Sequence, residues 1–204
     1  MKKWQALALD FWSRYKYWVF ITGGIFLLGS LVGLFAPTLF SDSASEGLKK
    51  FVDNFMTVLP SLKIDSKLEA SQAIAANIRL LVVFWLLGLS LVGLPFIGAL
   101  LFFRGFALGL TISYLISRQV SSGLVVTILA VLPQNIVFLP VLLGAAILAA
   151  VFSLRLVKKS STGKSNSFAF YNACFGFLAA GAAFSAWVQG YVTPFLLNGF
   201  LNLL

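Results

Sequence analysis

Long apolar runs separated by short polar stretches dominate the chain and predict membrane-spanning helices. The apolar runs occupy residues 18–39, 78–103, 106–116, 124–154 and 168–188. A helix needs about 20 predominantly apolar residues to cross the hydrocarbon core of a bilayer. We therefore predict an all-α fold, a polytopic membrane helix bundle of about five transmembrane spans with short re-entrant or kinked segments. Residues 1–204 are expected to form a single integral membrane domain.

Breaks within the runs predict where spans turn or bend. Pro95 lies in the inner half of the second run, and Arg104 with Gly105 predicts a tight turn into the third. The third run is short, so it either continues through the polar residues that follow it or is re-entrant. The apolar tail after Gly190, which Pro194 also interrupts, is too short to cross alone.

The fourth run contains two prolines and a polar pair, Gln134 and Asn135, next to Pro133. Proline removes a backbone hydrogen bond from a helix and bends it. One long kinked span fits this pattern, and two half-length helices that meet inside the membrane fit it almost as well. The sequence leaves both arrangements open.

Residues 41–77 form the one extended polar segment, predicted to be an external helical loop. Apolar residues recur at helical spacing through Leu48, Phe51 and Phe55 until Pro60, which predicts a short amphipathic helix. This helix lies on the bilayer or forms a docking site for a partner. A capping pair, Ser66 and Glu69, begins a second helix that runs without interruption into the second span.

Charge predicts the orientation of the spans. With the N-terminus in the cytoplasm, the inner side receives nine cations and one acid, Asp10. The cations are Lys2, Lys3, Arg14, Lys16, Arg104, Arg155, Lys158, Lys159 and Lys164. The outer side receives six cations and five acids. Most of these cations lie in the long loop, where positive charges have less influence on the orientation of the spans. Residues 155–166 are thus predicted to be a cytoplasmic basic loop of a multi-pass cell-membrane protein.

Composition agrees with this assignment and excludes several functions. Hydrophobic residues make up 60% of the chain and charged residues 10%, against roughly 25% charged residues in soluble domains. The net charge of +9 comes from cations that flank apolar runs, so it indicates topology and not nucleic-acid binding. Cys174 is the only cysteine, so an internal disulfide is excluded.

Candidate chemistry is sparse. The sequence has no histidine, and no Asp or Glu falls inside a predicted span, so intramembrane proteases and proton-coupled carriers lack the groups that they need. We expect no enzyme activity, no metal and no cofactor. Gln134 and Asn135 are expected to face protein or a cavity, either as hydrogen-bonding groups between helices or as the lining of a substrate path.

Two glycine pairs have the spacing that lets membrane helices approach closely, Gly29 with Gly33 and Gly105 with Gly109. Gly176 and the alanines near it extend this pattern in the last run. These faces pack either within the chain or against spans of a partner or of a second copy of the chain, so a homo-oligomer stays open.

Four strings, in this order and spacing, resemble those of the stage II sporulation protein M family. They are Gly88-Leu89-Ser90-Leu91-Val92-Gly93-Leu94-Pro95, Phe103-Arg104-Gly105-Phe106-Ala107-Leu108-Gly109, Leu132-Pro133-Gln134-Asn135 and Phe152-Ser153-Leu154-Arg155-Leu156. The resemblance implies a membrane scaffold of the engulfment machinery in endospore formation. In such machinery two membrane-anchored peptidoglycan hydrolases assemble with this protein as their organiser. The alternative is a permease-like subunit of a transport system, with Arg104, Pro133, Gln134 and Asn135 near a translocation path.

Overall fold

The computed structural model describes residues 2–39, 46–47, 50, 54, 66–118, 122–157 and 164–196. These residues form long helices, and no strand occurs among them. The long helices are α1 (Lys2–Leu39), α3 (Ser66–Gly88), α4 (Gly93–Arg118), α5 (Ser122–Val157) and α6 (Lys164–Trp187). A short π-helix, η2 (Val188–Val192), extends α6.

Each long helix contains a stretch that is long and apolar enough to cross a membrane. These stretches are Lys16–Leu39, Ser66–Gly88, Gly93–Tyr114, Leu132–Leu156 and Phe168–Leu196. Their outward faces carry exposed apolar side chains such as Phe20, Phe103 and Phe177, as expected where lipid replaces water as the solvent. The prediction of an all-α, multi-pass membrane bundle with five spans is confirmed.

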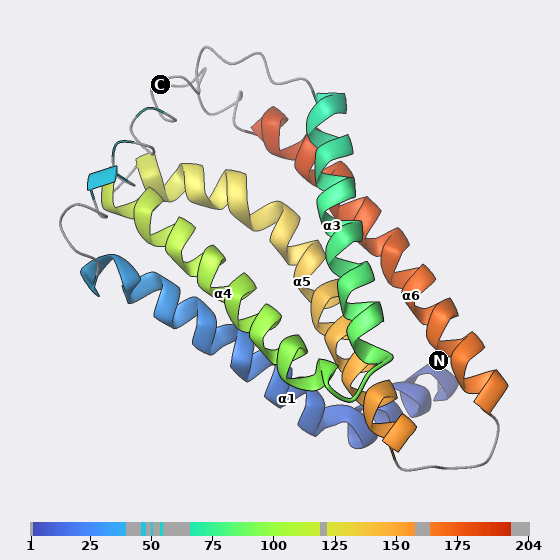
Figure 1. The fold of residues 1–204 in the computed structure, drawn as a ribbon. Helices are drawn as coiled ribbons and strands as arrows, with labels where there is room; N and C mark the ends of the chain where they lie inside the picture. The colour runs from blue at the N-terminus through green and yellow to red at the C-terminus, as the bar shows by residue number, and fades with distance from the viewer. Residues whose placement is uncertain are drawn as a thin grey trace.

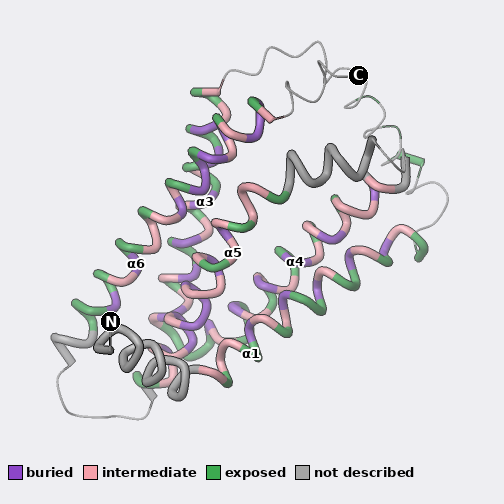
Figure 2. The backbone as a smooth tube through the Cα atoms, turned by 180° about the vertical axis from the view of Figure 1, so that it is seen from behind, coloured by how far each residue is buried: buried purple, intermediate pink, exposed green. Residues whose placement is uncertain are grey.

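The helices form two groups that share α5. In Figure 1, α4 lies between α1 and α5, while α3 and α6 lie together on the other side of α5. Small residues allow this central position, because Ala145, Ala146 and Ala149 of α5 are fully buried. Phe84 and Leu101 pack on them from α3 and α4. In Figure 2 the buried residues face the middle of the bundle and the exposed ones its outside.

The turn between the second and third spans lies at residues 89–92, so the predicted turn at Arg104 and Gly105 is wrong. The second span ends at Gly88, and α4 continues from Gly93 through Arg104 to Arg118. Pro95 accordingly lies in the first turn of α4, where a helix tolerates proline because the missing N–H has no intrahelical partner. Arg104 lies inside a span and no longer counts among the cytoplasmic cations.

Residues 122–157 form one helix, so the structure selects the single-span arrangement of the fourth run over two half-helices. The helix continues through Pro133 and Pro140 and is visibly curved in Figure 1. Proline accounts for the bend, since its ring displaces the carbonyl of the preceding turn.

The last helix continues beyond its predicted end. Gly190 does not break it but lies in η2, and helical residues extend to Leu196. A Cβ at Gly190 would clash with the backbone of Ala70 on α3, so glycine permits the close approach of these two segments. The residues after Leu196 lie outside the described part of the chain.

The long polar segment is described only in part. Helix α3 begins at Ser66 with Glu69 in its first turn, as the capping pair predicts. The predicted amphipathic helix with Leu48, Phe51 and Phe55 lies outside the described residues. The placement of this segment outside the cell stays a prediction.

Candidate functional site

Helices α1 and α4 are held together through glycine. A Cβ at Gly29 or Gly33 would clash with the carbonyl oxygens of Phe102 and Phe106, respectively. In the reverse direction, a Cβ at Gly105 would clash with the carbonyl oxygen of Phe26, and one at Gly109 with that of Ser30. The two backbones therefore touch over both glycine pairs, and these predicted small faces pack within the chain.

Polar side chains close the turn between α3 and α4, residues 89–92, called the inner turn because the predicted orientation places it on the cytoplasmic side. The N–H of Leu89 donates to Leu86 O (3.1 Å), which ends the regular hydrogen-bond ladder of α3. The hydroxyl of Tyr171 donates to Trp85 O (2.9 Å), and the hydroxyl of Ser153 donates to Ser90 O (2.8 Å). Helices α5 and α6 thus add donors at this turn. Trp85 O lies in the last turn of α3, where carbonyls lack intrahelical partners, whereas Ser90 O also accepts from the N–H of Gly93 (3.1 Å).

Polar contacts also join α3 to α6 along their length. Asn77 Nδ2 donates to Ala182 O (3.3 Å), and Trp85 Nε1 donates to Asn172 Oδ1 (2.8 Å). Near the opposite end from the inner turn, Gln189 Nε2 donates to Glu69 Oε1 (3.2 Å). Interhelical bonds of this kind stabilise membrane bundles by about 0.6 kcal/mol each. They fix the α3–α6 pair.

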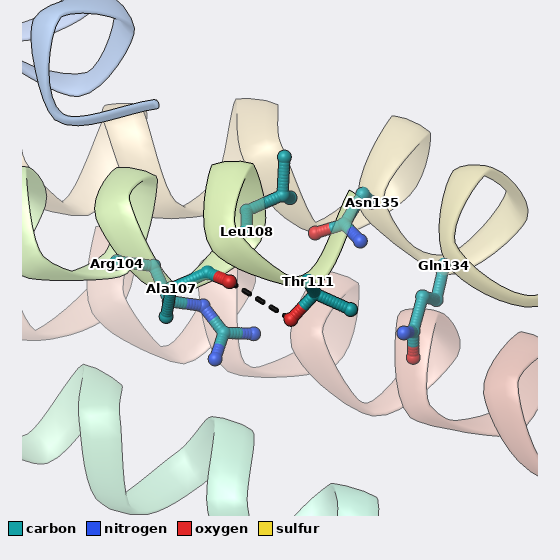
Figure 3. A pocket seen from close by; sticks show the side chains of 6 residues that line it. All are labelled: Arg104, Ala107, Leu108, Thr111, Gln134 and Asn135. Atoms are coloured by element: carbon teal, nitrogen blue, oxygen red, sulfur yellow. Dashed lines mark hydrogen bonds between the residues drawn. The ribbon is translucent and has the colours of Figure 1, made fainter. Parts of the chain in front are cut away.

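A polar pocket lies between α4 and α5, with a volume of about 160 Å³. Its lining consists of Arg104, Ala107, Leu108, Thr111, Gln134 and Asn135. Figure 3 shows the side-chain ends of Arg104, Thr111 and Gln134 on the same side of the two helices. The structure thus brings together three predicted site residues from two helices, Arg104 of α4 with Gln134 and Asn135 of α5.

The pocket residues are held in place by their neighbours. The guanidinium of Arg104 lies over the ring of buried Phe138, with its Cζ 5.4 Å from the ring centroid. The hydroxyl of Thr111 donates to Ala107 O (2.8 Å) within α4. Ser185 of α6 donates to the backbone oxygen of Gln134 (3.0 Å), next to Pro133 in α5. The segment around Pro133 and Gln134 in α5 is therefore anchored to α6 through the backbone oxygen of Gln134. The side chains of Gln134 and Asn135 line the pocket with residues of α4.

The remaining predicted site residues have other positions. Pro95 lies in the first turn of α4 and does not line the pocket, and Gly105 and Gly109 contact α1. Sequence reasoning does not find Tyr171, and it includes Ser153 only as a member of a family-like string. Their roles depend on acceptors that are distant in sequence, Trp85 O and Ser90 O. Within the described residues, no three side chains of the His, Cys, Asp or Glu type gather into a metal site.

One small-residue face stays uncovered. Ala169, Ala173, Gly176 and Ala180 of α6 are all exposed, and a Cβ at Gly176 would meet no atom within 4 Å. The spacing of these residues places them on one side of the helix. In contrast to the glycines of α1 and α4, this part of the predicted pattern has no partner among the described residues of the chain.

Comparison with known protein families gives one match. The family described as stage II sporulation protein M, SpoIIM, matches residues 21–194. This range includes the three middle membrane-crossing stretches, most of the first and the last, the inner turn and the polar pocket. Neither the curated proteins nor the solved structures that were compared contain a match.

Proposed function

This chain belongs to the stage II sporulation protein M family, and on that basis we propose that it is a non-catalytic scaffold for membrane-anchored peptidoglycan hydrolases. Membership makes it a sporulation-related membrane protein, and its five apolar helices make it multi-pass. The scaffold would assemble two such hydrolases and localise them during engulfment, when peptidoglycan is remodelled. The family match over 21–194 is the observation that carries this proposal.

The uncovered face of α6 supports the scaffold role. A partner anchored by its own membrane helix needs a surface on which two backbones can approach closely, and small residues provide such a surface. The α1–α4 glycines are already occupied by internal packing. The α6 face, defined by Ala169, Ala173, Gly176 and Ala180, is therefore the face on which we place the anchor of a hydrolase.

The test is affinity purification of the full-length protein from native membranes of sporulating cells, followed by mass spectrometry. We expect the wild type to recover membrane-anchored peptidoglycan hydrolases. The double substitution Gly176→Leu with Ala180→Leu should lower their recovery about ten-fold or more, the effect of losing about 1.4 kcal/mol of packing energy. An equal recovery from this variant would contradict the α6 placement.

A matched control is Ala99→Leu, since Ala99 is an exposed alanine of α4 outside the α6 face. This substitution should leave recovery unchanged. Deletion of residues 46–59 tests separately whether the polar segment holds the hydrolases. Unchanged co-purification after that deletion would mean that the segment does not contribute.

The polar pocket favours a second candidate, a permease-like subunit of a transport system. Arg104, Gln134 and Asn135 line one cavity between two spans, as residues of a substrate path would. A transport role predicts that a separate ATPase co-purifies, or that liposomes with the purified protein show ATP-dependent flux. Absence of flux together with recovery of wall hydrolases would leave the scaffold role as the supported one.

A further inference from the structure

Arg104 is a cation in the interior of a membrane-crossing helix. It lies roughly 16 Å along the helix axis from Gly93 and roughly 21 Å from Arg118, the two ends of α4. The hydrocarbon core of a bilayer is about 30 Å thick. A charged side chain at such a depth is costly, and it usually faces a cavity or an opposite charge and marks a functional site.

No opposite charge meets Arg104 in the described part of the chain. No acidic residue lines the pocket, whose polar members besides Arg104 are Thr111, Gln134 and Asn135. The only acid within the five membrane-crossing stretches of the described chain, Glu69, lies in the first turn of α3 and accepts a hydrogen bond from Gln189. The charge of Arg104 is thus left for a ligand to neutralise.

The lining suits an anion with several oxygens. A guanidinium has five N–H donors in a planar fork, and each carboxamide adds two N–H donors. Arginine alone can satisfy a carboxylate in bidentate fashion, whereas a phosphate group has further oxygens that the carboxamides of Gln134 and Asn135 can meet. This arrangement favours phosphate over the carboxylate of a partner helix.

The size and surroundings of the pocket fit a phosphate group that enters from the side. Cavities of about 150 Å³ in proteins take a molecule the size of benzene, and this one measures about 160 Å³. Phe103, Leu132 and Ile136 flank it along the helices and are exposed, as lipid-facing residues would be. The ring of buried Phe138 packs against the guanidinium and helps to hold it in position.

We propose that the pocket between α4 and α5 binds a negatively charged phosphate group through Arg104, assisted by Gln134 and Asn135. The phosphate belongs either to an anionic lipid or to a soluble phosphate ion. This site is independent of hydrolase docking on α6, because it requires only the chain itself and the membrane.

The experiment uses the purified full-length protein in two arms. In the first, native mass spectrometry measures lipid retained after reconstitution with phosphatidylglycerol or with phosphatidylcholine. In the second, thermal unfolding in phosphatidylcholine alone is measured with inorganic phosphate and with chloride at equal ionic strength. A lipid ligand predicts selective retention of phosphatidylglycerol in the first arm, and a soluble ligand predicts stabilisation by phosphate in the second.

In whichever arm the wild type shows binding, Arg104→Gln should weaken that binding about ten-fold or more, as expected when a charge-assisted hydrogen bond is lost. Arg104→Lys should retain part of it, since charge persists without the planar fork. The matched control is Arg79→Gln. Arg79 is an exposed arginine of the α3 span whose Nε donates to Ala75 O (3.2 Å), and it does not line the pocket.

Three outcomes would overturn the proposal. The first is a wild type that shows no preference in either arm, and the second is an equal loss in Arg79→Gln, which would indicate a general effect of charge. The third is release of a co-purifying membrane protein by Arg104→Gln with both arms unchanged, which would identify a carboxylate of that protein as the ligand. None of these results bears on the α6 face, so the scaffold proposal is tested separately.

Discussion

Single glycines decide how closely α1 and α4 approach. The atoms that a Cβ would meet at Gly29, Gly33, Gly105 and Gly109 are backbone atoms of the facing helix, which cannot rotate away as a side chain can. Close backbone packing of this kind replaces the hydrophobic effect as the source of helix association in lipid.

Gly109→Ala is accordingly expected to destabilise the protein. The added methyl group would clash with the Ser30 carbonyl and force the helices apart, at a cost of about 1–3 kcal/mol. Thermal unfolding in detergent micelles measures the effect. Gly24→Ala is the control, because a Cβ at Gly24 meets nothing within 4 Å and alanine favours helix by about 1 kcal/mol. Equal stabilities of the two variants would contradict the proposed role of Gly109.

At this scale the sequence predicts the glycine pairs but not their partners. The spacing of Gly105 and Gly109 indicates a small face, and that is a local property of one helix. Which helix covers that face depends on how all five helices pack. The sequence alone is therefore equally compatible with packing within the chain and with packing against another protein. The role of Tyr171 cannot be predicted for the same reason, because its acceptor, Trp85 O, lies in a helix that is far away in sequence although it is adjacent in the fold.

At the scale of elements, the number of spans follows from apolar length, whereas the position of the inner turn does not. Arg104 with Gly105 has the charge and the flexibility of a cytoplasmic turn. The actual turn, residues 89–92, is uncharged, and it is stable because Ser153 and Tyr171 supply hydrogen bonds near it. Gly88, Gly93 and Pro95 around it are ordinary signals of a helix end and a helix start, and here they mark the turn better than the charge of Arg104 does.

Cysteine labelling distinguishes the two positions of the turn. In a Cys174→Ser background, Ser90→Cys should react with a membrane-impermeant maleimide from the cytoplasmic side, because Ser90 is an exposed turn residue. Phe103→Cys should not react, because Phe103 is exposed within the α4 span and faces lipid. A turn at Arg104 and Gly105 would produce the reverse labelling pattern.

At the scale of the whole molecule, each of the five spans carries the described chain across the membrane, so that successive loops alternate between its two sides. With the predicted cytoplasmic N-terminus, the inner loops include the turn at 89–92 and the basic residues 155–166, and the outer side includes the long polar segment. Removing Arg104 from the inner cations leaves the basic residues near the N-terminus and after α5 on that side. The positive-inside rule still favours a cytoplasmic N-terminus.

Reporter fusions test this orientation. Alkaline phosphatase, which is active outside the cytoplasm, should be active when fused after Arg118 or after Leu204. It should be inactive when fused after Lys164, in the basic loop. An inactive fusion after Leu204 together with an active one after Lys164 would reverse the orientation of the bundle.

The hydrogen bonds at the inner turn have a consequence for the order in which the protein is assembled. Helices α3 and α4 are synthesised before the residues that complete their junction, since Ser153 belongs to α5 and Tyr171 to α6. Until those two helices have entered the bilayer, the carbonyls of Ser90 and Trp85 lack their interhelical donors. In a ribosome-bound chain that ends before α6, the turn between α3 and α4 should therefore still lack the hydrogen bond from Tyr171. Insertion of the last helix supplies that bond and completes the contacts of the second and third spans.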